Sequence, residues 1–274
     1  MVINHRKALT PFRLTKFHYT NLFFLLLLLH VAAGVYFDSY SWWWILFSLL
    51  VYLLVLAAGS YFIQWNFYFP SQNRLPSLKV SLQKGKIGFA HSGKQVALSF
   101  DDGPSVHTEE VLDILKKEQV LATFFLIGKN INGQENLLKR MVAEGHSLGN
   151  HSFYHRGSFD WQSTQKMRAE LEKTNEAITA VTERKVCLFR PPFGVTNPNL
   201  GKAINSLGLR SIGWNVRSYD TIARNEKRLL QRILQKVKPG SILLLHDRCA
   251  ITASILPELV KQLKIKGYSF TAIH

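Results

Sequence analysis

The chain of 274 residues is long enough for one large domain with an appendage, and its net charge of +16 favours anionic neighbours such as lipid headgroups, phosphorylated glycolipids or cell-wall polymers. Its lysines and arginines are scattered and no nucleic-acid-binding motif accompanies them, so we expect no nucleic-acid partner. The only two cysteines, Cys187 and Cys249, exclude a disulfide scaffold, and we expect both to be small buried side chains.

Two apolar segments dominate residues 1–70. The first runs from Asn21 to Phe37 and the second from Trp42 to Ile63. A helix needs about 20 apolar residues to cross a bilayer, so the second segment is long enough and the first only just. Aromatic residues cluster at both ends of the second segment, as expected at two membrane interfaces. The sequence predicts a two-helix transmembrane hairpin, and the alternative is a cleaved signal peptide, which would also have basic residues before an apolar core.

The charges around this hairpin predict on which side of the membrane the C-terminal part lies. Arg6, Lys7, Arg13 and Lys16 precede the first segment, and four more basic residues follow the second, whereas the connecting loop holds only Asp38. Basic residues flank the cytoplasmic ends of membrane spans. With two spans both flanks lie on one side, so this rule predicts a cytoplasmic C-terminal part. If the first segment does not span, that part lies outside.

Residues 71–95 have no long periodicity and are predicted to be a linker. From residue 96 to 274, seven short apolar runs alternate with amphipathic stretches that predict helices over 107–119, 134–144, 162–183, 197–207, 226–236 and 250–266. We expect Thr108 to cap the first of these helices. Strand–helix alternation indicates a parallel sheet covered by helices, here an incomplete or distorted (β/α) barrel. Polar residues at the strand ends would converge on one face of it.

The first apolar run ends in "ALSFDDGPS", with Asp101 and Asp102 side by side. Neighbours in a strand point to opposite faces, so both carboxylates reach one cleft only where the strand ends and the chain turns. Two adjacent carboxylates repel unless their roles differ. A metal bound by one of them would leave the other free as a base. The alternative is a polar turn after a strand.

A second motif, "HSFYH", places His151 and His155 four residues apart, which lets one ion bind both imidazoles. A carboxylate and two histidines leave coordination positions open, as in a catalytic rather than a structural site. Non-haem iron oxygenases use the same ligands, so the ligands alone do not define the reaction. Nearby His146 is expected to have a core or capping role, and Asp247 to cap a turn.

The motifs "SFDDGP", "HSFYH", "RPPFG" and "LLLHD", in this order over residues 96–274, resemble those of the polysaccharide deacetylases with a NodB homology domain, carbohydrate esterase family 4. The resemblance implies an α/β fold with a distorted (β/α)7 barrel, and one divalent metal, usually zinc. It also implies a hydrolase of carbon–nitrogen bonds other than peptide bonds. Such an enzyme would remove an N-acetyl or other N-acyl group from an amino sugar of a polysaccharide or lipid-linked glycan.

By this resemblance, Asp101 is the general base, and Asp102, His151 and His155 are the metal ligands. Arg190 of "RPPFG" would hold Asp101 in place, because a guanidinium fork suits a carboxylate. Most relatives act on cell-wall polymers outside the cell, in contrast to the cytoplasmic side that the charge rule predicts.

The resemblance further implies that His246 is the general acid for the leaving amine and that Asp220 favours its cation. The backbone N–H of Phe193 would help to hold the oxyanion, and Leu244 would line a pocket for the acetyl methyl group.

The fourth motif departs from the family pattern, which often has an aspartate, two residues and then Asp-Trp. Here Arg217 stands at the first aspartate position and Thr221 at the tryptophan position, while Asp220 matches the retained aspartate. Loss of the tryptophan removes a wall of the groove for long sugar chains, so the substrate is less defined than the chemistry. The alternative function is a membrane-anchored carbohydrate-binding pseudoenzyme, which the complete set of catalytic residue types disfavours.

Overall fold

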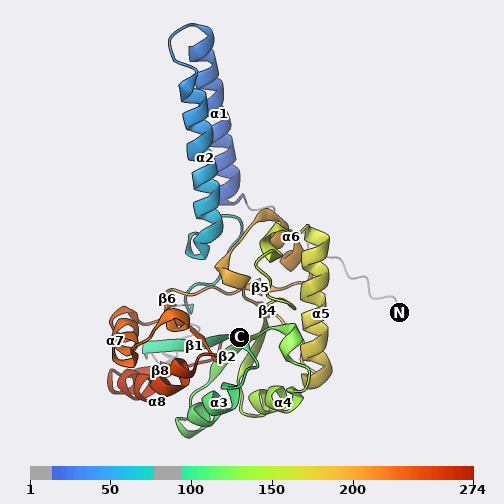
Figure 1. Ribbon diagram of the computed structural model, residues 1–274, viewed down its shortest axis with the longest axis vertical. Helices are drawn as coiled ribbons and strands as arrows, with labels where there is room; N and C mark the ends of the chain where they lie inside the picture. Colours follow the sequence, from blue (N-terminus) through green and yellow to red (C-terminus); the bar gives the residue numbers. More distant parts are fainter. Residues whose placement is uncertain (1–13, 77–93) are drawn as a thin grey trace, which may run out of the picture.

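The computed structural model describes residues 14–76 and 94–274, which form a helical hairpin joined to a curled sheet surrounded by helices (Figure 1). The strands are β1 (Lys94–Gly103), β2 (Ala122–Leu126), β3 (Ser147–Asn150), β4 (Leu188–Phe189), β5 (Arg210–Ser211), β6 (Val216–Arg217), β7 (Ser241–His246) and β8 (Tyr268–Phe270). The helices are α1 (Lys16–Tyr36), α2 (Trp43–Tyr61), α3 (Thr108–Lys117), α4 (Glu135–Ala143), α5 (Thr164–Thr182), α6 (Pro198–Ser206), α7 (Glu226–Lys236) and α8 (Ala250–Ile265).

The sheet is the distorted (β/α)7 barrel that the resemblance implies. Its strands follow the order β5-β4-β3-β2-β1-β7-β6, and every pairing is parallel. β8 lies beside this path and pairs with the start of β1. In the described part of the chain β5 and β6 do not pair with each other. We call this gap between β5 and β6 the seam.

One of the seven apolar runs predicted as strands, "SIGWNV" (residues 211–216), is divided between two strands. β5 pairs with β4 and β6 pairs with β7, so residues 212–215 cross the seam between them. The prediction of one strand was wrong because β5 and β6 are each only two residues long, and hydrophobic periodicity does not resolve so short a break.

Residues 71–75, within the predicted linker, run along the seam. The N–H of Gln72 donates to the carbonyl oxygen of Ser211 at 2.9 Å, and the N–H of Leu75 donates to that of Gly240 at 2.9 Å. The first bond satisfies a carbonyl group of β5 that the missing β5–β6 pairing would leave open, and the second bond lies directly before β7. Residues 77–93 of the predicted linker lie outside the described residues.

The base of the hairpin packs into the barrel. Ile63 is 2% exposed and belongs to the apolar cluster inside the barrel, together with Trp214. Gln64 Nε2 donates to the carbonyl oxygen of Trp214 at 3.2 Å, and Ser60 Oγ donates to that of Thr196 at 2.6 Å. Hairpin and barrel consequently share part of one core.

Helices α1 and α2 lie side by side and project away from the barrel (Figure 1). Their most apolar stretches have mean hydropathies of 1.7 and 2.1, and only 11% of each stretch is buried. Lys16 Nζ donates to the carbonyl oxygen of Trp65 at 2.8 Å, so the start of α1 and the end of α2 meet beside the barrel. The two predicted apolar helices are present, and length and hydropathy are their only membrane signals.

The helices around the barrel begin and end within two residues of their predicted bounds. The predicted cap at Thr108 was wrong: α3 starts at this residue, His107 occupies the cap position, and the Thr108 hydroxyl donates to Asp247 Oδ2 at 2.6 Å. The expected burial of the cysteines was also wrong, because Cys187 is exposed and Cys249 is half-buried.

Candidate active site

Asp101 and Asp102 face one pocket because the backbone is distorted at the end of β1. The register of β1 against β2 shifts between Asp101 and Gly103, and Asp102 has a φ of 74°. Residues other than glycine rarely adopt this left-handed backbone conformation. The bulge breaks the alternation of the strand, so both neighbouring carboxylates line the same pocket.

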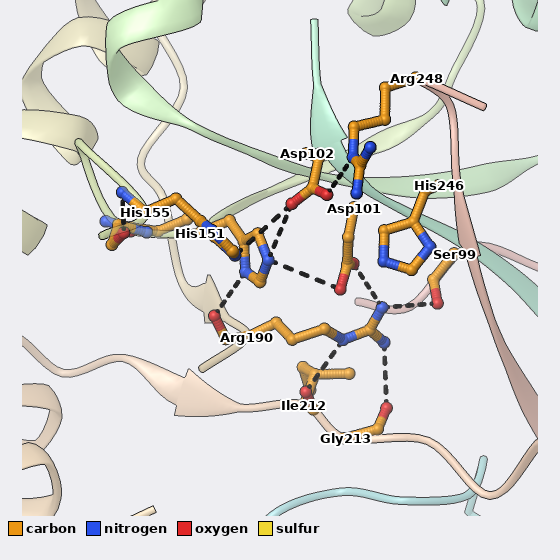
Figure 2. Close-up of polar contacts among 12 residues, drawn as sticks. Ser99, Asp101, Asp102, His151, His155, Arg190, Ile212, Gly213, His246 and Arg248 are labelled. Carbon is orange, nitrogen blue, oxygen red and sulfur yellow. Dashed lines mark hydrogen bonds and ion pairs between the residues drawn. The ribbon is translucent and has the colours of Figure 1, made fainter. Parts of the chain in front are cut away.

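Asp102, His151 and His155 converge on one point (Figure 2). Their ligand atoms lie within 4.8 Å of one another, and both histidine Nε2 atoms are 3.5 Å from Asp102 Oδ1. This oxygen is buried and accepts no hydrogen bond from the described part of the chain. A buried acceptor without a donor is costly, and a divalent cation between the three atoms would satisfy it. The donor set therefore fits a metal ion.

The surroundings favour the ligating forms of Asp102 and His155, and they orient His151. His151 Nδ1 donates to the backbone oxygen of Arg190 at 2.8 Å, which leaves Nε2 directed at Asp102. Burial and the nearby His151 lower the pKa of His155 to about 4. Burial raises the pKa of Asp102, but the nearby His151 and the hydrogen bond from Arg248 outweigh it and hold that pKa far below its usual range. An ionised carboxylate and a neutral imidazole are the forms that bind metal.

Asp101 belongs to a separate network centred on Arg190, whose side chain is fully buried. Arg190 Nη1 donates to Asp101 Oδ1 at 2.7 Å and to Ser99 Oγ at 2.8 Å. Its other nitrogens donate to the carbonyl oxygens of Ile212 at 3.2 Å and Gly213 at 3.0 Å (Figure 2). Asp101 Oδ2 accepts no hydrogen bond from the described residues, so one oxygen of a fixed carboxylate faces the pocket.

On β7, His246 is held by Asp220. Asp220 Oδ1 accepts from His246 Nδ1 at 2.8 Å, while Oδ2 accepts from the His246 N–H and from Thr252 Oγ1, both at 2.7 Å. The imidazole Nε2 is left for the pocket that His246 lines. Burial lowers the pKa of His246, but the hydrogen bond and negative charge of Asp220 outweigh it and raise that pKa. The arrangement stabilises a protonated imidazole.

The pocket that these groups share has a volume of about 230 Å³ and is also lined by Phe193 and Leu244. Phe193 has a φ of 56°, its ring centroid lies 4.6 Å from that of His155, and its N–H donates to nothing in the described chain. Leu244, on β7, is 3% exposed. Residues other than glycine with positive φ recur around the pocket: Asp102, Ser152, His155, Phe193 and Tyr219. Such strain is typical of functional sites.

Two residues of the pocket were not predicted from the sequence. Arg248 is half-exposed, and its Nε donates to Asp102 Oδ2 at 2.6 Å, so it orients the carboxylate from the side opposite the histidines. Its only signal was its place directly after "LLLHD". Trp214 lies in the segment that crosses the seam and lines the pocket. Trp214 was missed because "SIGWNV" was predicted to be a strand.

His146 and Asp247 lie outside the ligand set. His146 is 4% exposed and its Nδ1 accepts from the N–H of Ala122 at 3.1 Å, which is the core role expected. Asp247 is buried against the Thr108 hydroxyl, and burial raises its pKa to about 7.

A family profile described as polysaccharide deacetylase matches residues 90–212. The chain is 35% identical over 207 residues to the peptidoglycan-N-acetylglucosamine deacetylase PgdA of Listeria monocytogenes. The aligned region covers 75% of this chain but only 42% of that relative. It is 35% identical over 185 residues to the peptidoglycan-N-acetylmuramic acid deacetylase PdaA of Bacillus subtilis, covering 66% of this chain and 70% of that one.

Solved structures agree with these relatives. The Xyl-CE4 domain of a multidomain xylanase from the Trinervitermes trinervoides hindgut metagenome superposes with a TM-score of 0.62 at 34% identity, covering 66% of this chain and 88% of that one. A CE4 family pseudoenzyme from Bacillus anthracis also gives a TM-score of 0.62, at 32% identity, covering 66% of this chain and 64% of that one. Fold, motifs and relatives agree, and the chain belongs to the polysaccharide deacetylase family.

Proposed function

We propose that the chain is a metal-dependent hydrolase that removes an N-acetyl or other N-acyl group from an amino sugar of a polysaccharide or lipid-linked glycan. One observation carries this proposal: a single pocket contains a metal-ligand triad and two independently supported proton-transfer groups, Asp101 and His246. Hydrolysis of an amide needs a base for the attacking water and an acid for the leaving nitrogen. A carbohydrate-binding pseudoenzyme would need neither.

Asp101 is the proposed general base. Arg190 fixes one of its oxygens at 2.7 Å and leaves the other toward the pocket, so the carboxylate is held in one orientation. Asp101 takes a proton from the water that attacks the acyl carbon. Arg190 is in turn held by two backbone carbonyl oxygens, which keeps the base in one position throughout the reaction.

His246 is the proposed general acid. An amine leaves poorly unless its nitrogen is protonated, and the raised pKa of His246 supports a proton on the imidazole before the carbon–nitrogen bond breaks. Asp220 holds the ring by Nδ1, so the proton passes to the sugar nitrogen from Nε2. The free N–H of Phe193 would donate to the developing oxyanion, and Leu244 would contact the acyl methyl group.

Asp102, His151 and His155 would hold the cation, and we propose zinc because two imidazoles and one carboxylate are typical of open catalytic zinc sites. When bound there, the metal supplies Lewis-acid polarisation and lowers the pKa of water. Arg248 keeps the ligating carboxylate oriented through its second oxygen.

We further propose that α1 and α2 anchor the chain in a membrane, because their apolar side chains are largely exposed and their lengths match a bilayer. By the positive-inside rule, the basic flanks favour a barrel on the cytoplasmic side. The names of PgdA and PdaA point to peptidoglycan sugars, but the chain spans only 42% of the length of PgdA.

Amine release by the full-length chain tests the proposal. The protein would be purified in a neutral detergent, loaded with zinc, and incubated with N-acetylated and N-formylated amino sugars while primary amine and free acid are measured. We expect both products in equal amounts, and loss of activity with a chelator that readdition of zinc reverses. Sugar binding without product would favour the pseudoenzyme, and consumption of dioxygen would favour an oxygenase; either result would overturn the proposal.

A further inference from the structure

A second hollow adjoins the catalytic pocket on the side of the hairpin. We call it the hairpin-side groove; it has a volume of about 260 Å³ and is lined by Tyr61, Phe62, Gln64, Trp214, Arg217 and Lys236. Trp214 and Arg217 also line the catalytic pocket, so the two hollows share a wall. The groove therefore leads from the catalytic residues to the end of α2.

Arg217 differs from the two arginines that hold the catalytic carboxylates. Arg190 and Arg248 donate to Asp101 and Asp102, respectively. The guanidinium of Arg217 has neither a hydrogen bond nor an ion pair with the described residues. It lies over aromatic rings instead, 5.9 Å from the centre of Trp214 and 5.1 Å from that of Tyr219.

An unpaired, half-buried guanidinium at the junction of two hollows is suited to bind an anion. Lys236, which also lines the groove, is exposed and has no carboxylate partner among residues 14–76 and 94–274. The rings of Trp214 and Tyr219 lie beside the guanidinium of Arg217, and a planar guanidinium fork favours bidentate binding of phosphate. Thr221, lining the catalytic pocket near this junction, is small enough to leave room for such a group.

Beyond these cations the surface becomes apolar. Tyr61 and Phe62 are 59% and 41% exposed at the base of the hairpin, where α2 ends. Along this path the molecule thus offers a deacylation site, then the unpaired Arg217 at the junction, then a groove with Lys236 and exposed aromatic residues beside an apolar hairpin. A ligand that matches this order has an acylamino sugar, then an anion, then a hydrocarbon chain.

We propose that the substrate is an N-acylated amino sugar joined through a phosphate to a lipid, and that Arg217 and Lys236 bind the phosphate. This inference rests on the proposed N-deacylation and membrane anchoring, and it narrows the substrate to a lipid-linked sugar phosphate. Arg217 is the specificity residue of this site, acting on the phosphate rather than on the amide.

Three substrates separate the contributions of phosphate and lipid: the dodecyl ester of N-acetylglucosamine 1-phosphate, free N-acetylglucosamine 1-phosphate, and neutral dodecyl N-acetylglucosaminide. With the full-length, zinc-loaded protein in neutral detergent, we expect kcat/KM to be highest for the dodecyl phosphate ester. Equal values for the phosphate ester and the neutral glycoside would overturn the role of phosphate. Equal values for the ester and the free sugar phosphate would overturn the role of the lipid.

Arg217→Gln is expected to lower kcat/KM for both phosphorylated substrates by at least about tenfold relative to the neutral glycoside, the usual value of a charge-assisted bidentate contact. Arg228→Gln, an exposed arginine of α7 that lines neither hollow, is the matched control and should leave all ratios unchanged. An equal loss on all three substrates would assign Arg217 a structural role and overturn the proposal.

Binding of dodecyl phosphate by isothermal titration calorimetry keeps this test independent of turnover. We expect Arg217→Gln to weaken binding at least about tenfold, and Arg228→Gln to leave it unchanged. If neutral sugars are deacylated but dodecyl phosphate binds equally to both variants, the anion site is wrong while the proposed function stands. If dodecyl phosphate binds through Arg217 but no sugar is deacylated, the anion site stands and the proposed function is wrong.

Discussion

Replacement of Arg190 by methionine is the most demanding test of the network behind the pocket. The side chain is fully buried and makes four hydrogen bonds: to Asp101, to Ser99 and to two backbone carbonyl oxygens. Methionine fills part of the space but donates nothing. The substitution therefore leaves a buried carboxylate without its cation and two buried carbonyl oxygens without donors.

The structure sets the size of the effect. Removing one partner of a buried ion pair costs about 3–5 kcal/mol, and the two carbonyl hydrogen bonds add about 1 kcal/mol each. The sum of about 5–7 kcal/mol is comparable to the whole stability of an ordinary domain. At about 2–4 °C per kcal/mol for a barrel of this size, the expected decrease in Tm is at least about 10 °C.

The assay is thermal unfolding of the full-length protein in one detergent, with Arg228→Met as an exposed control. Replacing both partners, in Asp101→Leu/Arg190→Met, should restore part of the Tm lost in Arg190→Met, because apolar pairs tolerate burial better than a single unpaired charge. A decrease of less than about 3 °C in Arg190→Met, or a double variant less stable than the single one, would refute the reasoning.

Three further predictions follow from the pocket and the hairpin. His151→Ala and His155→Ala should each lower zinc content in elemental analysis while His246→Ala should not; equal loss in all three would place His246 among the ligands. Asp220→Asn removes the negative charge that raises the pKa of His246, so the alkaline limb of the pH–rate profile, where the imidazole loses its proton, should move to lower pH; an unmoved limb would contradict the acid role. A green fluorescent protein fused after His274 should fluoresce in cells, whereas a dark fusion together with an active alkaline phosphatase fusion would mean that the barrel lies outside.

The order of the helices around the barrel was predictable because their hydrophobic periods are long and regular. The paired carboxylates of Asp101 and Asp102 were also predicted to reach one cleft. The backbone conformation that allows this, a bulge with positive φ at Asp102, has no sequence signal, since neither residue is a glycine. The motifs and the family resemblance thus indicated residues that the structure brings together, but not the strain that allows it.

Other features could not be predicted because they depend on contacts distant in sequence. Arg248 and Asp102 are 146 positions apart in the sequence, and no local periodicity identifies Arg248 as a partner. Gln72 and Leu75 lie in a polar segment with no strand pattern, yet they bond along the seam because β5 and β6 leave backbone groups unpaired there. Thr108 is a residue type that often caps helices, but its hydroxyl donates to the buried carboxylate of Asp247 instead. In each case a tertiary partner outweighed the local preference.

The most direct test of the central claim compares the zinc-loaded wild-type chain with Asp101→Asn, in which the amide oxygen still accepts from Arg190 while the base is lost. Zinc content by elemental analysis and amine release from one N-acetyl amino sugar would be measured on the same samples. The account predicts equal zinc and a rate lower by a factor of about 10² to 10⁴, the usual contribution of a positioned general base. Undiminished amine release by a fully zinc-loaded Asp101→Asn protein would contradict it.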